Sequence, residues 1–176
     1  MSGHNKWSQI KNKKGAKDRN RAKVFTKILK ALAAAARDEQ NPDFNPRLRS
    51  MIELAKENNV PSDNIARAIA GAKEGKVLES IVVEAYGPEK VALIIEALTD
   101  NRNRTIQEIR TTLQKHEAKM GEMGSARWAF EKASPGARWT PKFTQTISDN
   151  GADSLAALLE ALEDLDDVQQ IFENAE

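Results

Sequence analysis

The hydrophobic pattern of this chain changes near Gly75, and that change most limits the folds open to it. Before Gly75, apolar residues recur at helical spacing, as at Leu48 and Ile52. After it, segments 80–87 and 91–98 are rich in Val and Ile, which is typical of strands. The pattern predicts an all-helical domain over residues 1–75, followed by a domain with a sheet over residues 76–176.

The helical domain is predicted to hold three helices. Residues 15–37 are rich in Ala, Lys and Leu and contain no Pro, and Val24, Ile28 and Leu32 form an apolar stripe. We expect one end of this helix to be buried and the other to project, preceded by a basic arm. Asn45 is a suitable N-cap for a second helix, and a third ends at Gly71.

The second domain alternates between strands and helices. Strands are predicted at 80–87, 91–98, 125–130, 142–148 and 168–172, with one helix after Thr105 and another from Asp149 or Asn150. This order predicts an α+β domain with helices on one face of a mainly antiparallel sheet.

Charge is distributed very unevenly. Residues 1–37 contain eleven Lys or Arg and a single acid, Asp18, whereas residues 149–176 contain nine acids and no basic residue. The total charge of +1 hides this asymmetry. A dense positive surface attracts polyanions, and phosphate backbones are the commonest of these in a cell. We therefore expect the basic N-terminal stretch to bind nucleic acid.

Trp7 lies among these basic residues and has two interpretations. An aromatic ring between Lys6 and Lys11 could stack on an exposed base. Alternatively, it could fill a hydrophobic gap against the helical domain. The sequence leaves both open.

Segment 99–105 is a second polar stretch, between a predicted strand and a helix N-terminus. Arg102 and Arg104 could hold phosphate there, since guanidinium binds phosphate in a two-pronged geometry and the helix dipole favours anions. The alternative is that the segment caps the helix and the arginines are surface residues.

Few residues suit catalysis or cofactor binding. There is no cysteine, and His4 and His116 lack metal-ligand spacing. An acidic cluster at 163–167 could bind a divalent cation, so a metal-dependent hydrolase is a minor alternative. We expect no cofactor and no catalytic activity. No apolar run approaches the ~20 residues of a membrane span, so we expect a cytoplasmic protein.

Several motifs together resemble the YebC/PmpR family, whose mitochondrial relatives are translational activators. Gly3-His4-Asn5-Lys6-Trp7 is similar to its opening signature, and Gly124-Ser125-Ala126-Arg127-Trp128-Ala129-Phe130 to a later one. Further matching segments are 23–27, 45–49, 61–69, 86–88, 98–105 and 162–169. The resemblance spans nearly the whole chain.

The chain also departs from the family pattern. Glu89-Lys90 and Glu117-Ala118 stand where the family usually has Gly-Gly. The family normally inserts a further α/β module after the strand ending at Phe130. Here only residues 131–141 bridge the gap, so the chain resembles a family member that lacks its third module.

The resemblance implies a non-enzymatic regulator, either a DNA-binding transcriptional regulator or a ribosome-associated translation factor that binds RNA and relieves stalling. Most cations of the basic stretch are Lys, and these side chains would contact phosphate without reading bases. The residues predicted to contact nucleic acid are Lys6, Trp7, Lys11, Lys13, Lys14, Lys17, Arg19, Arg21, Lys23, Lys27, Arg102 and Arg104.

Overall fold

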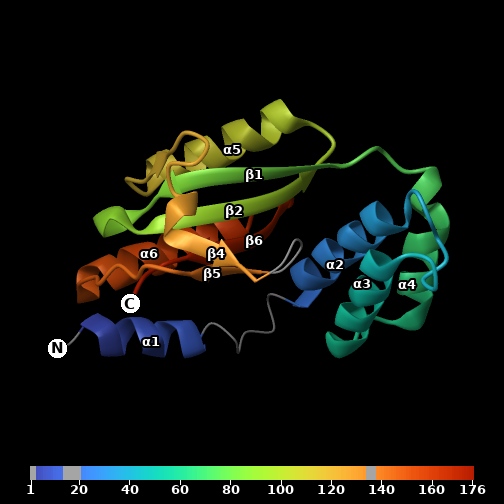
Figure 1. Ribbon diagram of the computed structural model, residues 1–176, viewed down its shortest axis with the longest axis horizontal. Coiled ribbons are helices and arrows are strands. Elements are labelled where there is room, and N and C mark those ends of the chain that lie inside the picture. Colours follow the sequence, from blue (N-terminus) through green and yellow to red (C-terminus); the bar gives the residue numbers. More distant parts are fainter. Residues whose placement is uncertain (1–2, 14–20, 134–137) are drawn as a thin grey trace. The chain divides into compact units, whose positions relative to one another are not determined.

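The computed structural model describes residues 3–133 and 138–176 except for 14–20 (Figure 1). Its contacts divide the chain into two units. The helical unit comprises residues 17–79, and the α+β unit comprises residues 1–16 together with 80–176. The sequence assigns residues 1–75 to one helical domain, whereas in the structure residues 1–16 group with the sheet.

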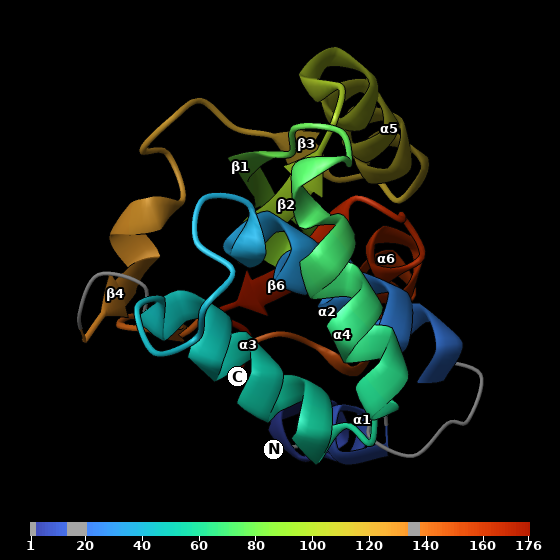
Figure 2. The same ribbon diagram turned by 90° about the vertical axis from the view of Figure 1, so that its right-hand side faces the viewer.

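Three helices build the helical unit: α2 (Arg21–Ala36), α3 (Pro46–Glu57) and α4 (Ser62–Ala70) (Figure 2). A short 3-10 helix, η3 (Gly71–Lys73), follows α4. The core between them contains Leu32, Leu48 and Ala55, all fully buried. Asn45 caps α3 as predicted, because its side-chain oxygen accepts a 3.0 Å hydrogen bond from the N–H of Leu48.

The α+β unit contains an antiparallel sheet of four strands in the order β3-β1-β2-β6. These strands are β1 (Glu79–Tyr86), β2 (Ala92–Thr99), β3 (Lys119–Met120) and β6 (Val168–Glu173). Helices α5 (Arg102–Lys115) and α6 (Asp149–Glu163) cover one face, as Figure 2 shows. Leu93 and Ile95 of β2 pack there with leucines of both helices. The predicted α+β fold is confirmed.

The N-terminal segment is a helix rather than a basic arm. Helix α1 (Gly3–Lys13) packs against α6, and Trp7 belongs to the core formed by the sheet, α5 and α6. Burying the large apolar ring of Trp7 explains why α1 packs there. The sequence pattern did not reveal this contact because its partner, α6, lies about 150 residues away along the chain.

The opposite face of the sheet is covered by residues 121–133 and 138–143. Two strand predictions, for 125–130 and 142–148, are wrong. Within 125–130 the chain forms a 3-10 helix, η5 (Arg127–Ala129), followed by β4 (Phe130–Lys132). The Glu84 carboxylate accepts hydrogen bonds from the backbone N–H groups of Ala126 and Arg127, which a strand would need for pairing.

The strand predicted at 142–148 forms earlier, as β5 (Trp139–Pro141), and pairs with β4 in an antiparallel hairpin. The N–H groups of Lys142 and Phe143 bond instead to the carbonyl of Ala129. The predicted bridge at 131–141 is therefore largely this hairpin.

Two departures from the family pattern coincide with left-handed backbone. Glu89 and Lys90, in the 3-10 helix η4 (Pro88–Lys90), have φ of 51° and 66°, and Glu117 has φ of 56°. Glycine adopts this conformation without a steric penalty, which explains a Gly-Gly pair at such positions. The Glu89 carboxylate gains a compensating contact, because it accepts hydrogen bonds from the backbone N–H and hydroxyl of Ser148, the N-cap of α6.

Candidate nucleic-acid interface

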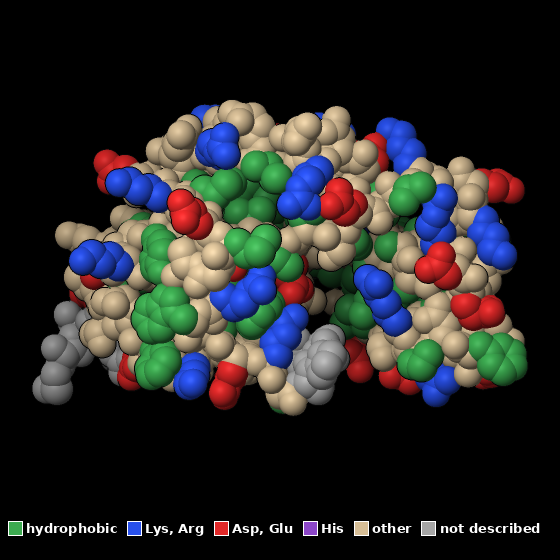
Figure 3. Space-filling view, turned by 45° about the horizontal axis from the view of Figure 1, so that its top comes forward, with side chains coloured by type: hydrophobic (Ala, Val, Ile, Leu, Met, Phe, Trp, Pro, Cys, Tyr) green, Lys and Arg blue, Asp and Glu red, His purple; other side chains and the backbone are tan. Residues whose placement is uncertain are grey.

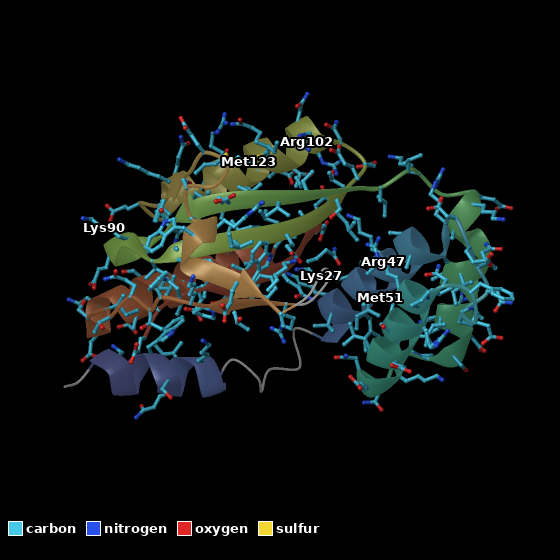
Figure 4. All side chains as sticks on the ribbon, viewed as in Figure 1. Lys27, Arg47, Met51, Lys90, Arg102 and Met123 are labelled. Atoms are coloured by element: carbon cyan, nitrogen blue, oxygen red, sulfur yellow. The ribbon has the colours of Figure 1, made fainter. Side chains whose placement is uncertain are left out.

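Helix α2 gives the helical unit a basic surface. Ile28, Leu32 and Ala36 are buried in the core of the unit, whereas Lys23 is exposed and Lys27 is partly exposed. Figure 4 labels Lys27 on this helix. The sequence of α2 contains four basic residues and no acid. The whole helical unit has thirteen Lys and Arg against nine Asp and Glu, so its net charge is +4.

Two lysines of α1 have acidic partners within the α+β unit. Lys6 Nζ lies 2.5 Å from Asp153 Oδ2 of α6, and Lys11 Nζ lies 2.6 Å from Glu173 Oε1 of β6. The hydrogen bond to Asp153 raises the pKa of Lys6. Both cations therefore neutralise carboxylates of their own unit.

Trp7 is only 4% exposed, so its ring cannot stack on an exposed base in this conformation. The alternative interpretation is correct in that the ring fills a hydrophobic gap, but the gap lies in the α+β unit rather than the helical domain. The ring is apolar over most of its area, and burial there is its largest available stabilisation.

The structure does not describe the side chains of five other predicted contact residues. Lys14, Lys17 and Arg19 lie outside the described residues. The backbones of Lys13 and Arg21 belong to α1 and α2, but their side chains also lie outside the description. Their role in binding stays a prediction.

Segment 99–105 forms a capping network at the start of α5. Asn101 is the N-cap, and its side chain accepts a 3.1 Å hydrogen bond from the N–H of Arg104. The hydroxyl of Thr105 donates to Asp167, which follows α6, and lies 2.7 Å from the hydroxyl of Thr99. The network joins the ends of β2, α5 and α6, so the helix-capping interpretation accounts for most of the motif.

The two arginines of this motif differ. Arg104 donates to Asp100 at 2.9 Å and to Asp167 at 2.7 Å, and these bonds raise the pKa of its guanidinium. Asp167 is buried, so the pair braces the fold. Arg102 is exposed at the N-terminal end of α5 (Figure 4). Phosphate contact by either arginine stays a prediction.

The acidic cluster at 163–167 does not form a metal site. Among the residues that the structure describes, no three Asp, Glu or His side chains are grouped to hold a metal ion. Asp167 pairs with Arg104 and Thr105 instead. Nor does any described helix have the length and apolar character needed to cross a membrane.

Sequence reasoning missed the aromatic residues that surround η5. Trp128 and Phe143 are more than half and half exposed, respectively, and Trp139 lies beside two cations. The alternation of polar and apolar residues in 125–130 predicts a half-buried strand, so this pattern gives no reason to expect exposed aromatic rings there. The signal that could have found them is the recurrence of an aromatic next to Lys or Arg at Arg127-Trp128, Arg138-Trp139 and Lys142-Phe143.

Two segments of the chain match the domains of one known family. Residues 5–75 match the TACO1/YebC protein N-terminal domain. Residues 78–135 match the TACO1/YebC second and third domain. The chain belongs to the TACO1/YebC family.

Relatives of this TACO1/YebC chain carry regulatory names. A protein of Pseudothermotoga lettingae, named a probable transcriptional regulatory protein, is 36% identical over all of this chain and 94% of its own length. Another with that name, from Trichlorobacter lovleyi, is 53% identical over 75% of this chain. That match covers only 55% of the Trichlorobacter protein, so the chain spans about half the length of such a relative.

A solved structure extends the TACO1/YebC comparison to the fold. The crystal structure of a conserved hypothetical protein from Aquifex aeolicus matches with a TM-score of 0.81 and 31% identity, over 90% of this chain and 91% of that one. The alignment with the Pseudothermotoga relative extends over 238 positions, 62 more than the 176 residues here. The absence of an inserted module remains a prediction, and this difference in length is consistent with it.

Proposed function

We propose that this chain is a non-enzymatic regulator that binds nucleic acid through α2 and the basic residues before it, and that it acts on transcription by binding DNA. One observation carries the proposal. Helix α2 packs its apolar side into the helical unit and has only basic residues among its charged side chains. Clustered Lys and Arg without intervening acids neutralise phosphates and release counterions, which drives binding to duplexes.

The names of the relatives favour DNA over other polyanions. A second candidate, a ribosome-associated translation factor, is favoured by the chemistry of the cations. Lys23, Lys27 and Lys30 are point charges that position a phosphate backbone, whereas sequence readout in the major groove uses Arg, Asn or Gln on base edges. Both candidates use the same face of α2.

The test measures binding of the full chain to a 20-base-pair DNA duplex and to an RNA duplex of the same sequence, by fluorescence anisotropy. Changing Lys23, Lys27 and Lys30 together to Gln should weaken both interactions while the melting temperature stays near wild type. A control variant changes Lys56 and Lys73 to Gln. Both are exposed cations elsewhere in the helical unit. Equal weakening in both variants, or none in either, would contradict the proposal.

Sedimentation of a cell lysate through a sucrose gradient separates the two candidates. A transcriptional regulator should remain at the top after nuclease treatment of DNA. A translation factor should migrate with ribosomes, and the α2 variant should leave them.

A further inference from the structure

The face of the sheet opposite α5 and α6 carries a second set of side chains suited to nucleic acid. The described residues of segment 121–143, which are 121–133 and 138–143, cross this face, and their buried side chains pack on those of β2 and β6. The residues of this contact are Ala92, Ile94, Ala126, Ala129, Phe130 and Phe172. On its other side the same segment exposes 88% of Met123, and Trp128 and Phe143 are 58% and 50% exposed.

Hydrogen bonds from below hold this segment in place. The carboxylate of Glu84, almost fully buried, accepts bonds of 2.7 to 2.8 Å from the backbone N–H groups of Gly124, Ala126 and Arg127. Burial alone would raise the pKa of Glu84, but these bonds and the charge of Arg127 lower it overall. Glu84 therefore stays ionised and fixes the loop that carries Trp128.

The exposed ring of Trp128 is also oriented. Its Nε1–H donates a 3.2 Å hydrogen bond to the hydroxyl of Tyr86, which in turn donates to the carbonyl of Ser125. The ring is thus held by its edge while more than half of the residue stays in contact with solvent. Holding a large apolar ring in water has no benefit for folding, which points to a binding role.

Cations lie beside Phe143 and Trp139. The Trp128 and Phe143 rings have centroids 5.7 Å apart, and Lys142 Nζ lies 5.5 Å from the centroid of Phe143. Beside them, Lys132 Nζ and the guanidinium of Arg127 lie 4.3 Å and 5.4 Å from the Trp139 centroid, and these two cations also pair with the carboxylates of Glu96 and Glu84. We call this set the aromatic-cation surface; its members are Arg127, Trp128, Lys132, Trp139, Lys142 and Phe143.

We infer that the aromatic-cation surface binds single-stranded nucleic acid, with unpaired bases stacked on Trp128 and Phe143 and the phosphates near Lys142. Stacked aromatics flanked by cations are the composition by which proteins bind single strands, because every base has an apolar face and every linkage a negative charge. On the face shown in Figure 3, hydrophobic and basic side chains of the α+β unit are neighbours.

This chemistry favours a single strand over the other occupants. A duplex conceals the faces of its bases, so it cannot stack on Trp128. A protein partner would be better served by a continuous apolar patch, whereas here Lys142 adjoins Phe143, and Lys132 and Arg127 adjoin Trp139. The surface belongs to the α+β unit and the proposed duplex-binding face to the helical unit, so either can fail without the other.

The experiment uses the full chain and four fluorescent probes: a 12-nucleotide oligouridine, a 12-nucleotide oligothymidine, and RNA and DNA duplexes of the same length. Trp128→Ala should weaken binding of the single strands about 5- to 150-fold, the range for loss of one stacked base. Duplex binding should change by less than about twofold, because no base stacks on Trp128 there. Stronger effects with oligouridine or oligothymidine tell which strand chemistry the surface prefers.

Two further variants serve as controls for Trp128→Ala. Trp128→Phe retains a stacking ring and should keep most of the single-strand affinity. Phe44→Ala removes an exposed ring from the helical unit and should change nothing. Exposed rings contribute little to folding, so all three variants should melt near wild type.

The inference is overturned if Trp128→Ala leaves single-strand affinity unchanged or weakens duplexes equally. It is also overturned if sedimentation shows a dimer of the chain that Trp128→Ala dissociates, since the surface would then bind a second copy. If the proposed function holds, changing Lys23, Lys27 and Lys30 in the same assay weakens duplex binding. This result does not depend on the effect of Trp128→Ala on single-strand binding.

Discussion

Helices α1 and α2 come from the same basic stretch, but they belong to different units of the fold. The lysines at 6 and 11 of α1 pair with Asp153 and Glu173, which lie near the other end of the chain. Helix α2 belongs to a unit of net charge +4, and all of its own charged residues are basic. A count of charge along the sequence therefore overstates what α1 can offer to a polyanion, because distant acids already neutralise it.

The largest expected effect concerns the anchor of α1. Trp7→Ala should destabilise the protein by about 3–5 kcal/mol, the usual cost of truncating a buried tryptophan. Chemical denaturation followed by circular dichroism measures it. Trp128→Ala is the matched control and should cost little, since its ring is mostly exposed. If Trp7→Ala instead kept its stability and lost affinity, Trp7 would be a base-stacking residue and α1 would join the interface.

The next effect extends the comparison to Arg104, whose charge is also used inside the fold. Arg104→Gln should lower the melting temperature, since Asp167 is buried and would lose its charged partner. Nucleic-acid affinity should change little. Arg102→Gln, at an exposed position of the same helix, should leave the melting temperature near wild type. If Arg104→Gln kept its stability but bound nucleic acid more weakly, Arg104 would be a nucleic-acid contact.

Helices α2 to α6 and the strands β1 and β2 could be predicted because their signals are local. The apolar stripe of α2, the Asn45 cap and the Val- and Ile-rich strands β1 and β2 depend on neighbours a few residues away. The structure of 121–143 could not be predicted in this way. It depends on Glu84, whose carboxylate binds backbone groups about 40 residues further on.

The candidate site shows the same limit. The basic character of α2 is visible in its composition. The pairing of Lys6 with Asp153 and of Arg104 with Asp167 is not, because these partners are 147 and 63 residues away along the chain. The sequence shows that Trp7 is an aromatic residue among lysines, but only the fold shows whether its ring is buried or exposed.

A smaller effect tests the ion pairs of α1 themselves. Changing Lys6 and Lys11 together to Ala should lower the melting temperature modestly, and chiefly through Lys11, because the Glu173 side chain is only 8% exposed and would lose its charged partner. Affinity for duplex DNA should stay within about twofold, because these two cations are already neutralised. Thermal melting and anisotropy on one preparation measure both. A large loss of affinity would mean that DNA displaces Asp153 and Glu173.

The smallest effect is a pH dependence at α6, the helix on which α1 packs. Hydrogen bonds from Ser148 lower the pKa of Glu89, so the folded state favours its ionised form. The resulting stabilisation is present above the pKa of an unfolded Glu, about 4.3, and is lost as pH falls through the lowered value. Glu89→Gln should therefore reduce stability at neutral pH and lose this difference in acid. Urea unfolding at several pH values measures it, and a constant difference across pH would exclude the Glu89 carboxylate as the cause.

The salt dependence of binding tests the distinction between α1 and α2 most directly. Affinity for a 20-base-pair DNA duplex is measured against salt concentration for the wild type, for Lys23, Lys27 and Lys30 changed to Ala, and for Lys6 and Lys11 changed to Ala. The slope of log affinity against log salt is about −0.9 per phosphate neutralised. It should become shallower by up to about 2.7 in the α2 variant and stay unchanged in the α1 variant. A shallower slope in the α1 variant with none in the α2 variant would contradict the account.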